Sequence, residues 1–246
     1  MIIAKLNDII SSLKESYMSE LCLSSELYPV SPADIGVLED ADIKNIPHLK
    51  DRVVVLIGNL KTGEKDKLLC GREIINKALE NKKSYIRVRF AFFSKFKRFD
   101  FISMFIKPLR LHKKFESSNI YHINPNEIRK LKIERNIRNK ENAYALTNPK
   151  FYLPPEERKR LYDKLYNSMK KGYDDQYPLD IMLLRMMGIK DTVNQGHHRM
   201  GIAMDLKLPL VAVRFSAAGG APRFLHPLLK IIADINIRLK LWNKKQ

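Results

Sequence analysis

Apolar and polar residues along the chain follow two periodicities, one typical of helices and one typical of buried strands. Residues 3–20 place apolar side chains at helical spacing, which predicts an amphipathic N-terminal helix. Two short apolar runs, 53–57 and 68–70, are separated by a polar turn and predict two strands. A predicted helix over 72–79 and a predicted strand over 85–90 complete a strand–turn–strand–helix–strand series.

The same series of elements recurs in the second half of the chain. Its strand, turn, helix and strand are predicted over 178–184, 186–190, 200–206 and 210–215. A longer helix over 154–171 precedes them, with prolines and glutamates at its start and Gly172 after its end. A final amphipathic helix is predicted to begin at Pro227.

This recurrence indicates an internal duplication. A shift of 125 positions aligns residues 53–90 with 178–215 without a gap and gives nine identical pairs among 38. These pairs include Gly71/Gly196 and Asp66/Asp191. Upstream, the pattern Tyr-x-x-x-Pro-x-x-Ile begins at Tyr28 and again at Tyr121, so the second copy carries a 32-residue insertion. The alternative interpretation is a chance match among the offsets compared.

Charge is unevenly distributed along the chain. The formal net charge is +18, and residues 95–171 hold 20 Lys/Arg against 8 Asp/Glu. Such a basic field attracts polyanions, such as a nucleotide, a nucleic acid, a phosphorylated glycan or an acidic membrane surface. A solvated basic face without a polyanionic partner is the alternative.

Aromatic and basic residues alternate over 90–111, where seven phenylalanines are interspersed with lysines and arginines. This combination suits stacking on single-stranded nucleic acid or contact with an anionic membrane or glycolipid surface. The competing interpretation is a linker whose phenylalanines fill the core between the two copies.

Two cysteines, Cys22 and Cys70, are too few for a disulfide framework and lack metal-ligand spacing, which favours a reducing compartment. The N-terminus carries no signal-peptide pattern, and no apolar run approaches the ~20 residues that span a bilayer. We therefore expect a cytoplasmic protein, with the inner membrane surface as a peripheral location.

One motif stands where a predicted strand gives way to a predicted helix: Asn194-Gln195-Gly196-His197-His198-Arg199. It follows an opening strand and turn over 120–128, a helix that ends at Gly172 and a strand that begins at Pro178. In this order the four features resemble the nucleotide-binding core of the ParB/sulfiredoxin superfamily. The family often has Asp before the box glycine, but this chain has Gln195, so no metal or substrate role passes to that position.

The resemblance implies that the box binds nucleotide phosphates. The family's second histidine and arginine contact phosphates, which corresponds here to His198 and Arg199, with His197 as a structural partner. A glycine at Gly196 permits close approach to a phosphate, and an arginine can also stabilise charge that develops during transfer. The first copy has Arg72, Glu73 and Ile74 at the box positions, which predicts a degenerate scaffold.

Phosphoryl transfer also needs a group that accepts the hydroxyl proton of the acceptor. Free serine kinases of this fold use an acidic residue after the opening strand, where this chain offers Glu127 and Glu134, and we favour Glu134. Asp191, in the turn before the box, is a candidate Mg²⁺ ligand. Its counterpart Asp66 in the degenerate copy favours a turn-capping role instead.

Together these observations predict an α/β (α+β mixed) fold with two ParB/sulfiredoxin-like units. The expected organisation is a degenerate copy with an N-terminal helix over 1–92, a basic aromatic linker over 93–117, and a nucleotide-binding copy with a C-terminal helix over 118–246. The predicted function is an ATP- or ADP-dependent phosphotransferase with Mg²⁺, acting on a hydroxyl of a small molecule, glycan or glycolipid. A ParB-like nucleotide-gated DNA-binding protein and a non-catalytic nucleotide-binding module remain as alternatives.

Overall fold

The computed structural model describes residues 19–42, 52–95, 113–128, 154–186 and 190–218, together with Pro227 and Ile231. These residues form a mixed α/β fold with one ten-stranded sheet. The strands are β1 (Ser19–Leu23), β2 (Tyr28–Val30), β3 (Val53–Leu56), β4 (Lys67–Cys70), β5 (Ile86–Lys95), β6 (Phe115–Glu116), β7 (Tyr121–Ile123), β8 (Leu179–Met186), β9 (Lys190–Gln195) and β10 (Val211–Ala217). The helices are α2 (Pro32–Gly36), α3 (Arg72–Glu80), the 3₁₀ turn η2 (Pro125–Glu127), α6 (Pro155–Lys170) and α7 (His197–Asp205).

Most predicted elements are confirmed, with differences at their ends. The helix expected over 200–206 begins three residues earlier, at His197, so the box itself forms its first turn. The N-terminal helix expected over 3–20 falls mostly outside the described residues, but its last two positions, 19 and 20, belong to β1. Of the predicted C-terminal helix, Pro227 and Ile231 are helical and the rest lies outside the described residues.

The sheet consists of two similar halves, and the strands of the second half follow in the reverse of the spatial order of the equivalent strands of the first half. The order β4-β3-β5-β2-β7-β10-β8-β9 places the first-half strands (19–95) on one side and the second-half strands (113–218) on the other. In each half an antiparallel hairpin is followed by a parallel pair, β3 with β5 or β8 with β10, and then by an antiparallel pair. The halves meet where β2 pairs with β7, at Val30 and Ile123.

The strand register corrects the gapless alignment by one residue. Val53 pairs with Val88 in β5, whereas Leu179, not Pro178, pairs with Val213 in β10. The offset is therefore 126 in β3 and β8 and 125 in the strands that follow. Both hairpins also shift register at the same point, after Val54 in one and after Asp180 in the other.

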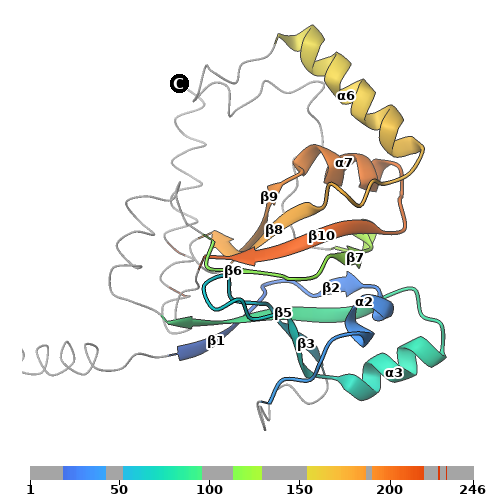
Figure 1. Cartoon of the computed structure of the whole chain (residues 1–246). Helices are drawn as coiled ribbons and strands as arrows, with labels where there is room; N and C mark the ends of the chain where they lie inside the picture. Colours follow the sequence, from blue (N-terminus) through green and yellow to red (C-terminus); the bar gives the residue numbers. More distant parts are fainter. Residues whose placement is uncertain are drawn as a thin grey trace, which may run out of the picture.

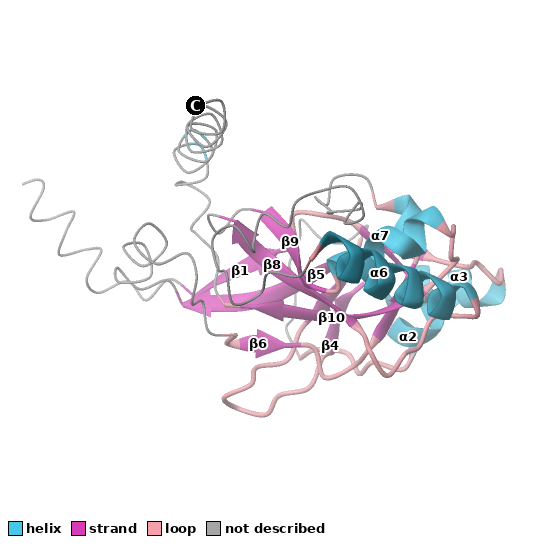
Figure 2. Cartoon of the chain, turned by 90° about the horizontal axis from the view of Figure 1, so that it is seen from above, coloured by secondary structure: helices cyan, strands magenta, loops and turns pink. Residues whose placement is uncertain are grey.

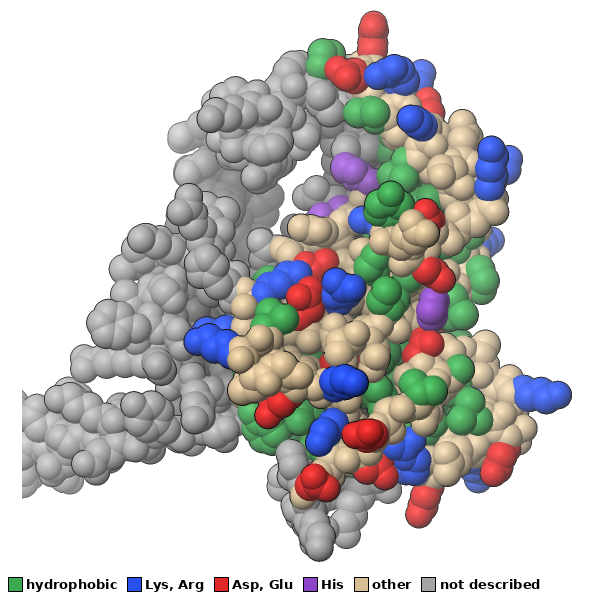
Figure 3. All heavy atoms as spheres, in the orientation of Figure 1, with side chains coloured by type: hydrophobic (Ala, Val, Ile, Leu, Met, Phe, Trp, Pro, Cys, Tyr) green, Lys and Arg blue, Asp and Glu red, His purple; other side chains and the backbone are tan. Residues whose placement is uncertain are grey.

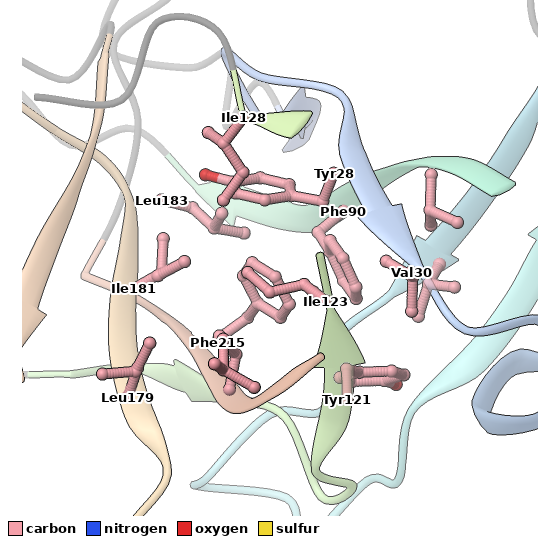
Figure 4. Packing of buried hydrophobic residues seen from close by; sticks show 14 of the residues in the cluster. Tyr28, Val30, Phe90, Tyr121, Ile123, Ile128, Leu179, Ile181, Leu183 and Phe215 are labelled. Carbon is pink, nitrogen blue, oxygen red and sulfur yellow. The ribbon is translucent and has the colours of Figure 1, made fainter. Parts of the chain in front are cut away.

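Four aromatic side chains join the halves in the core. They are Tyr28, Phe90, Tyr121 and Phe215, from β2, β5, β7 and β10, and all four are fully buried (Figure 4). The rings of Phe90 and Phe215 stack with centroids 3.7 Å apart. Two strands separate β5 from β10, so a flat sheet would hold them about 14 Å apart. The contact therefore requires a strongly coiled sheet.

The helices cover the two halves in matching ways. In Figure 1, α6 and α7 lie above β8 and β10, whereas α2 lies beside the right-hand part of β5 and α3 lies below it. Figure 2 shows that these four helices gather at the same end of the sheet. Helix α3 contributes Ile75 and Ala78 to the core, and α7 contributes Met200, Ile202 and Ala203.

The segment between the two halves is partly built into the sheet. Strand β5 extends to Lys95, and β6 pairs with β10, so both ends of the predicted linker 93–117 belong to the sheet. Phe90 and Phe92 are fully buried, in agreement with the core interpretation of this part, and residues 96–112 lie outside the described residues. Among the described residues no helix is both long and apolar enough to cross a bilayer.

Candidate functional site

Asp191, the predicted magnesium ligand, is a buried acceptor of hydrogen bonds. Its Oδ2 accepts from the phenol of Tyr28 at 2.8 Å and from the main-chain N–H of Glu26 at 3.2 Å. Its Oδ1 accepts from the N–H of Leu184 at 2.9 Å, and its own N–H donates to Ser25 Oγ at 2.8 Å. Burial raises the pKa of the Asp191 carboxyl, and these hydrogen bonds partly oppose that rise.

Asp66 occupies the matching place in the first half with the partners reversed. It accepts from the phenol of Tyr121 at 2.7 Å, from the N–H of Gly58 at 2.8 Å and from the N–H groups of Ser118 and Asn119 at 3.0 and 3.1 Å. Each aspartate is thus held by a tyrosine and a serine-containing bend of the other half. Both fill the turn-capping role that the shared position suggested.

A pair of serines precedes each of these tyrosines in the sequence, and the repeated pattern Tyr-x-x-x-Pro-x-x-Ile did not include it. Ser24 Oγ accepts from the N–H of Phe90 at 3.2 Å, and Ser117 Oγ accepts from the N–H of Phe215 at 3.0 Å. The shared pattern is therefore Ser-Ser-x-x-Tyr-x-x-x-Pro-x-x-Ile. In both halves the N–H of the neighbouring strand, which would donate to a main-chain carbonyl in a regular sheet, donates instead to the serine hydroxyl where the chain bends.

The aspartates do not assemble a metal centre in the described part of the chain. No group of three or more His, Cys, Asp or Glu side chains there has a geometry that could hold a metal ion. Both Asp191 oxygens already accept hydrogen bonds in a site shielded from solvent. The residues present at this position do not fit a Mg²⁺ site.

Gly196 forms the N-cap of α7, and Gly71 forms the N-cap of α3 in the equivalent turn. Both glycines have left-handed backbone conformations, with φ of 90° at Gly196 and 99° at Gly71. A Cβ at Gly196 would lie 2.5 Å from the Leu179 side chain, and one at Gly71 would lie 2.7 Å from the Arg52 carbonyl oxygen. Glycine is therefore required at both turns by conformation and by space.

Arg199 lies in the first turn of α7 and folds back over the N-terminus of the helix. Its Nη2 is 3.5 Å from the place a Cβ of Gly196 would occupy. Its Nη1 donates to the main-chain carbonyl of Tyr177, which also accepts from the Tyr173 phenol at 2.9 Å. Burial raises the pKa of Tyr173 to about 12, although the adjacent Arg199 opposes this rise. No described carboxylate forms an ion pair with Arg199.

The first turn of α3 has the opposite electrostatic character. Arg72 forms an ion pair with Asp40 at 2.7 Å and donates to the carbonyls of Gly36 and Leu38. Glu73 follows it in the first turn. In α7 the first turn contains no acidic residue, and its side chains are His197, His198 and Arg199. His198 is exposed and His197 is half-buried.

Of the two candidate proton acceptors, only Glu127 lies among the described residues. Glu134 lies outside the described residues. Glu127 lies in η2 and forms an ion pair with Arg87 at 2.9 Å, and Arg87 also donates to the Glu127 carbonyl at 2.8 Å. Glu127 therefore joins η2 to β5 across the two halves.

A polar network that sequence reasoning missed occupies one face of β8, β9 and β10. Asp180, which is buried, accepts from Ser216 Oγ at 2.8 Å, from Asn194 Nδ2 at 2.6 Å and from Lys113 Nζ at 2.9 Å. Lys113 also lies 3.2 Å from Glu116. Burial lowers the pKa of Lys113, but the hydrogen bonds to the two carboxylates outweigh it and raise the pKa overall. Figure 3 shows charged side chains of both signs side by side over the β6–β10 region.

The equivalent face of the first half is apolar. The residues that match this network there are Val54, Leu69, Ala91 and Leu23, which pack in a small hydrophobic cluster. Only a comparison of the two halves in the corrected register reveals this difference. Like the box, the polar network belongs to the second half alone.

His122 forms a bridge between the two halves. Its Nδ1 lies 3.2 Å from Asp34 of α2, and its Nε2 lies 3.2 Å from Asp175, which is in the loop between α6 and β8. Asp34 also accepts from the main-chain N–H of His122. The loop that contains Asp175 also contains Tyr173 and Tyr177, the neighbours of Arg199.

Comparison of the chain with protein-family models, with curated proteins and with solved structures gives no match.

Proposed function

We propose that the chain is a phosphotransferase that holds the phosphates of ATP or ADP at the N-terminus of α7. The two halves would be ParB/sulfiredoxin-like units, the first a degenerate copy that supports the second. The acceptor would be a hydroxyl of a small molecule, glycan or glycolipid. The basic field between residues 95 and 171 supports a phosphate-bearing partner.

The contrast between the two equivalent helix N-termini carries this proposal. Cationic side chains at the positive end of a helix dipole are unfavourable unless an anion lies beside them. At α3 that anion is supplied internally, because Asp40 pairs with Arg72 and Glu73 follows. At α7 the first turn contains no acidic residue, and Arg199 forms no ion pair with a described carboxylate, so a bound phosphate would supply a negative charge beside this arginine.

Arg199 is the residue expected to contribute most to binding. Its described hydrogen-bond partner at Nη1 is a neutral carbonyl, which does not balance the positive charge of the guanidinium. A guanidinium can donate two parallel hydrogen bonds to a phosphate, which a carbonyl cannot match in strength. The same group would stabilise negative charge that develops as the phosphoryl group is transferred.

The other box residues have supporting roles in this proposal. Gly196 would let a phosphate approach the main chain at the helix N-terminus, and no other residue fits this left-handed turn because a Cβ would lie 2.5 Å from the Leu179 side chain. His198, which is exposed, would contact a phosphate, and His197 would orient the turn. Glu134 would accept the proton of the acceptor hydroxyl. The proposal includes no magnesium ligand, because Asp191 is committed to hydrogen bonds in the core.

A thermal-shift screen with ATP, ADP, CTP and GTP, with and without Mg²⁺, tests the proposal. ATP or ADP at about 100 times its Kd should stabilise the protein by about 2.7 kcal/mol. ADP formation that depends on an added hydroxyl acceptor would then establish transfer. Stabilisation by ATP without turnover would leave a nucleotide-binding module, and stabilisation by duplex DNA alone would favour the ParB-like DNA-binding alternative. No stabilisation by any nucleotide would contradict the proposal.

A further inference from the structure

The bridge formed by His122 requires both ring nitrogens to act as donors. Nδ1 faces the Asp34 carboxylate and Nε2 faces the Asp175 carboxylate, each at 3.2 Å. A neutral imidazole carries one N–H, so it can donate to only one of the two carboxylates. The second carboxylate would then face a lone pair. Only the imidazolium form satisfies both contacts.

The surroundings of His122 favour this protonated form. His122 lies next to Ser31, which follows β2 and caps α2, and next to Ala212 of β10, and neither of these carries a charge. The charged group of the adjacent η2, Glu127, is paired with Arg87. Partial burial lowers the pKa of His122, but Asp175 and Asp34 outweigh this and raise the pKa above its usual value.

The two carboxylates differ in how firmly they are held. Asp34 lies in α2 and also accepts from the main-chain N–H of His122, so it stays in place without the imidazolium. Asp175 is 61% exposed. Loss of the proton should therefore release Asp175 rather than Asp34.

Asp175 belongs to the loop that holds Arg199. Two residues further along, the Tyr177 carbonyl accepts from Arg199, and Tyr173 donates to the same carbonyl. The loop is closed internally by hydrogen bonds from the N–H groups of Gln176 and Tyr177 to Asp174. A displacement of Asp175 would thus move the carbonyl that fixes the Arg199 guanidinium above Gly196.

We infer that His122 is a positioning residue for the α7 site: its protonated ring holds the loop 173–177 through Asp175, and the loop holds Arg199 over the helix N-terminus. The inference rests on the proposed function for its consequence, which is tighter phosphate binding when His122 is protonated. The loop movement itself can be measured without a ligand.

Amide hydrogen exchange of the unliganded full chain at pH 6 and pH 8 tests the loop movement. After correction for intrinsic exchange, the N–H groups of Gln176 and Tyr177 should lose about two- to fivefold protection at the higher pH, as expected for a partly exposed ion pair. NMR titration of the imidazole should place the change at the pKa of His122. In Asp175→Asn the protection should be low at both pH values.

Glu127→Gln is the matched control, because Glu127 is the counterpart of Asp34 in the second half but pairs with an arginine instead of a histidine. It should keep the wild-type pH dependence of loop protection. Unchanged loop protection in the wild type, or an equal change in Asp175→Asn, would overturn the inference.

Sulfate binding measures the consequence with an anion whose charge is constant across this pH range. Because other groups can contribute to the pH dependence of sulfate binding, the relevant quantity is the part of that dependence that Asp175→Asn removes. We expect that part to be about two- to fivefold between pH 6 and pH 8. If the loop titrates as expected but no sulfate or nucleotide binds at any pH, the proposed function fails while the loop mechanism stands. If sulfate binds but Asp175→Asn keeps the whole pH dependence, the positioning role fails.

Discussion

Tyr28 of the first half donates a hydrogen bond to Asp191 of the second half, with the phenol oxygen 2.8 Å from the carboxylate. Tyr121 of the second half donates to Asp66 of the first half at 2.7 Å. The two halves therefore complete one another's turns. We therefore expect the two halves, which the sequence suggests are separate copies, to unfold as one cooperative unit.

Loss of either tyrosine hydroxyl should destabilise the whole fold. Tyr28→Phe and Tyr121→Phe each remove a buried hydrogen bond to a carboxyl group, which costs about 1.5–3 kcal/mol. Urea denaturation should show one transition for each variant. Tyr85→Phe is the control, since the described contact of that ring is with Arg87 and its loss of a hydroxyl should cost under ~0.5 kcal/mol. Two separate transitions would contradict the interlocked halves.

Substitution of the N-cap glycines should follow a definite order of cost. Gly71→Ala meets main-chain atoms of Arg52 and Val53 below 3.0 Å, whereas Gly196→Ala meets a leucine side chain that can rotate away in part. A left-handed alanine costs about 1–2 kcal/mol, and overpacking adds about 1–3 kcal/mol. Gly63→Ala, with positive φ and open space, is the control for conformation alone. Chemical denaturation should rank the loss of stability as Gly71, then Gly196, then Gly63.

The His122 bridge should make folding stability depend on pH. Because the folded-state pKa is raised, the stabilisation is complete below the unfolded pKa of about 6.5 and is lost as pH rises through the folded value. Asp34→Asn should therefore lower stability more at pH 6 than at pH 8. Paired urea titrations of the wild type and the variant at both pH values measure this difference. An equal loss at the two values would contradict the linkage.

The polar network of the second half should be replaceable by its first-half counterpart. Asp180→Val alone leaves the buried hydroxyl of Ser216 and the amide of Asn194 without their acceptor, a loss of about 2–5 kcal/mol. The triple variant with Asn194→Leu and Ser216→Ala imports the matching first-half residues and should recover most of that loss. Thermal denaturation of both variants checks this. A triple variant less stable than the single one would contradict the equivalence of the two faces.

Most strands and helices could be predicted from the sequence, because hydrophobic periodicity and the glycines and prolines at element ends are local signals. The order of elements on both sides of Gly71 and Gly196 agrees with the structure. The gapless offset failed by one residue in β8, because the hairpin turns of the two halves differ in length and identity counts are insensitive to such a shift.

The partners of the aspartates could not be predicted from the sequence. A repeated Tyr and a repeated Asp are equally compatible with contacts inside each copy and with contacts between copies. The hydrogen bonds of Tyr28 to Asp191 and of Tyr121 to Asp66 show that each tyrosine reaches the opposite half. The coiled sheet, which also brings Phe90 and Phe215 into contact, makes this possible. The Asp180 network was missed for a related reason, since its members come from four separate segments and share no motif.

The measurement that tests the central claim most directly is calorimetric titration of ATP and ADP into the wild type, Arg199→Ala and Arg72→Ala. A charge-assisted contact of about 1.5–3 kcal/mol corresponds to a loss of about 10- to 100-fold in affinity. We predict this loss for Arg199→Ala and near wild-type affinity for Arg72→Ala, whose side chain is already paired with Asp40. Equal loss in both variants, or no binding by the wild type, would contradict a single phosphate site at the N-terminus of α7.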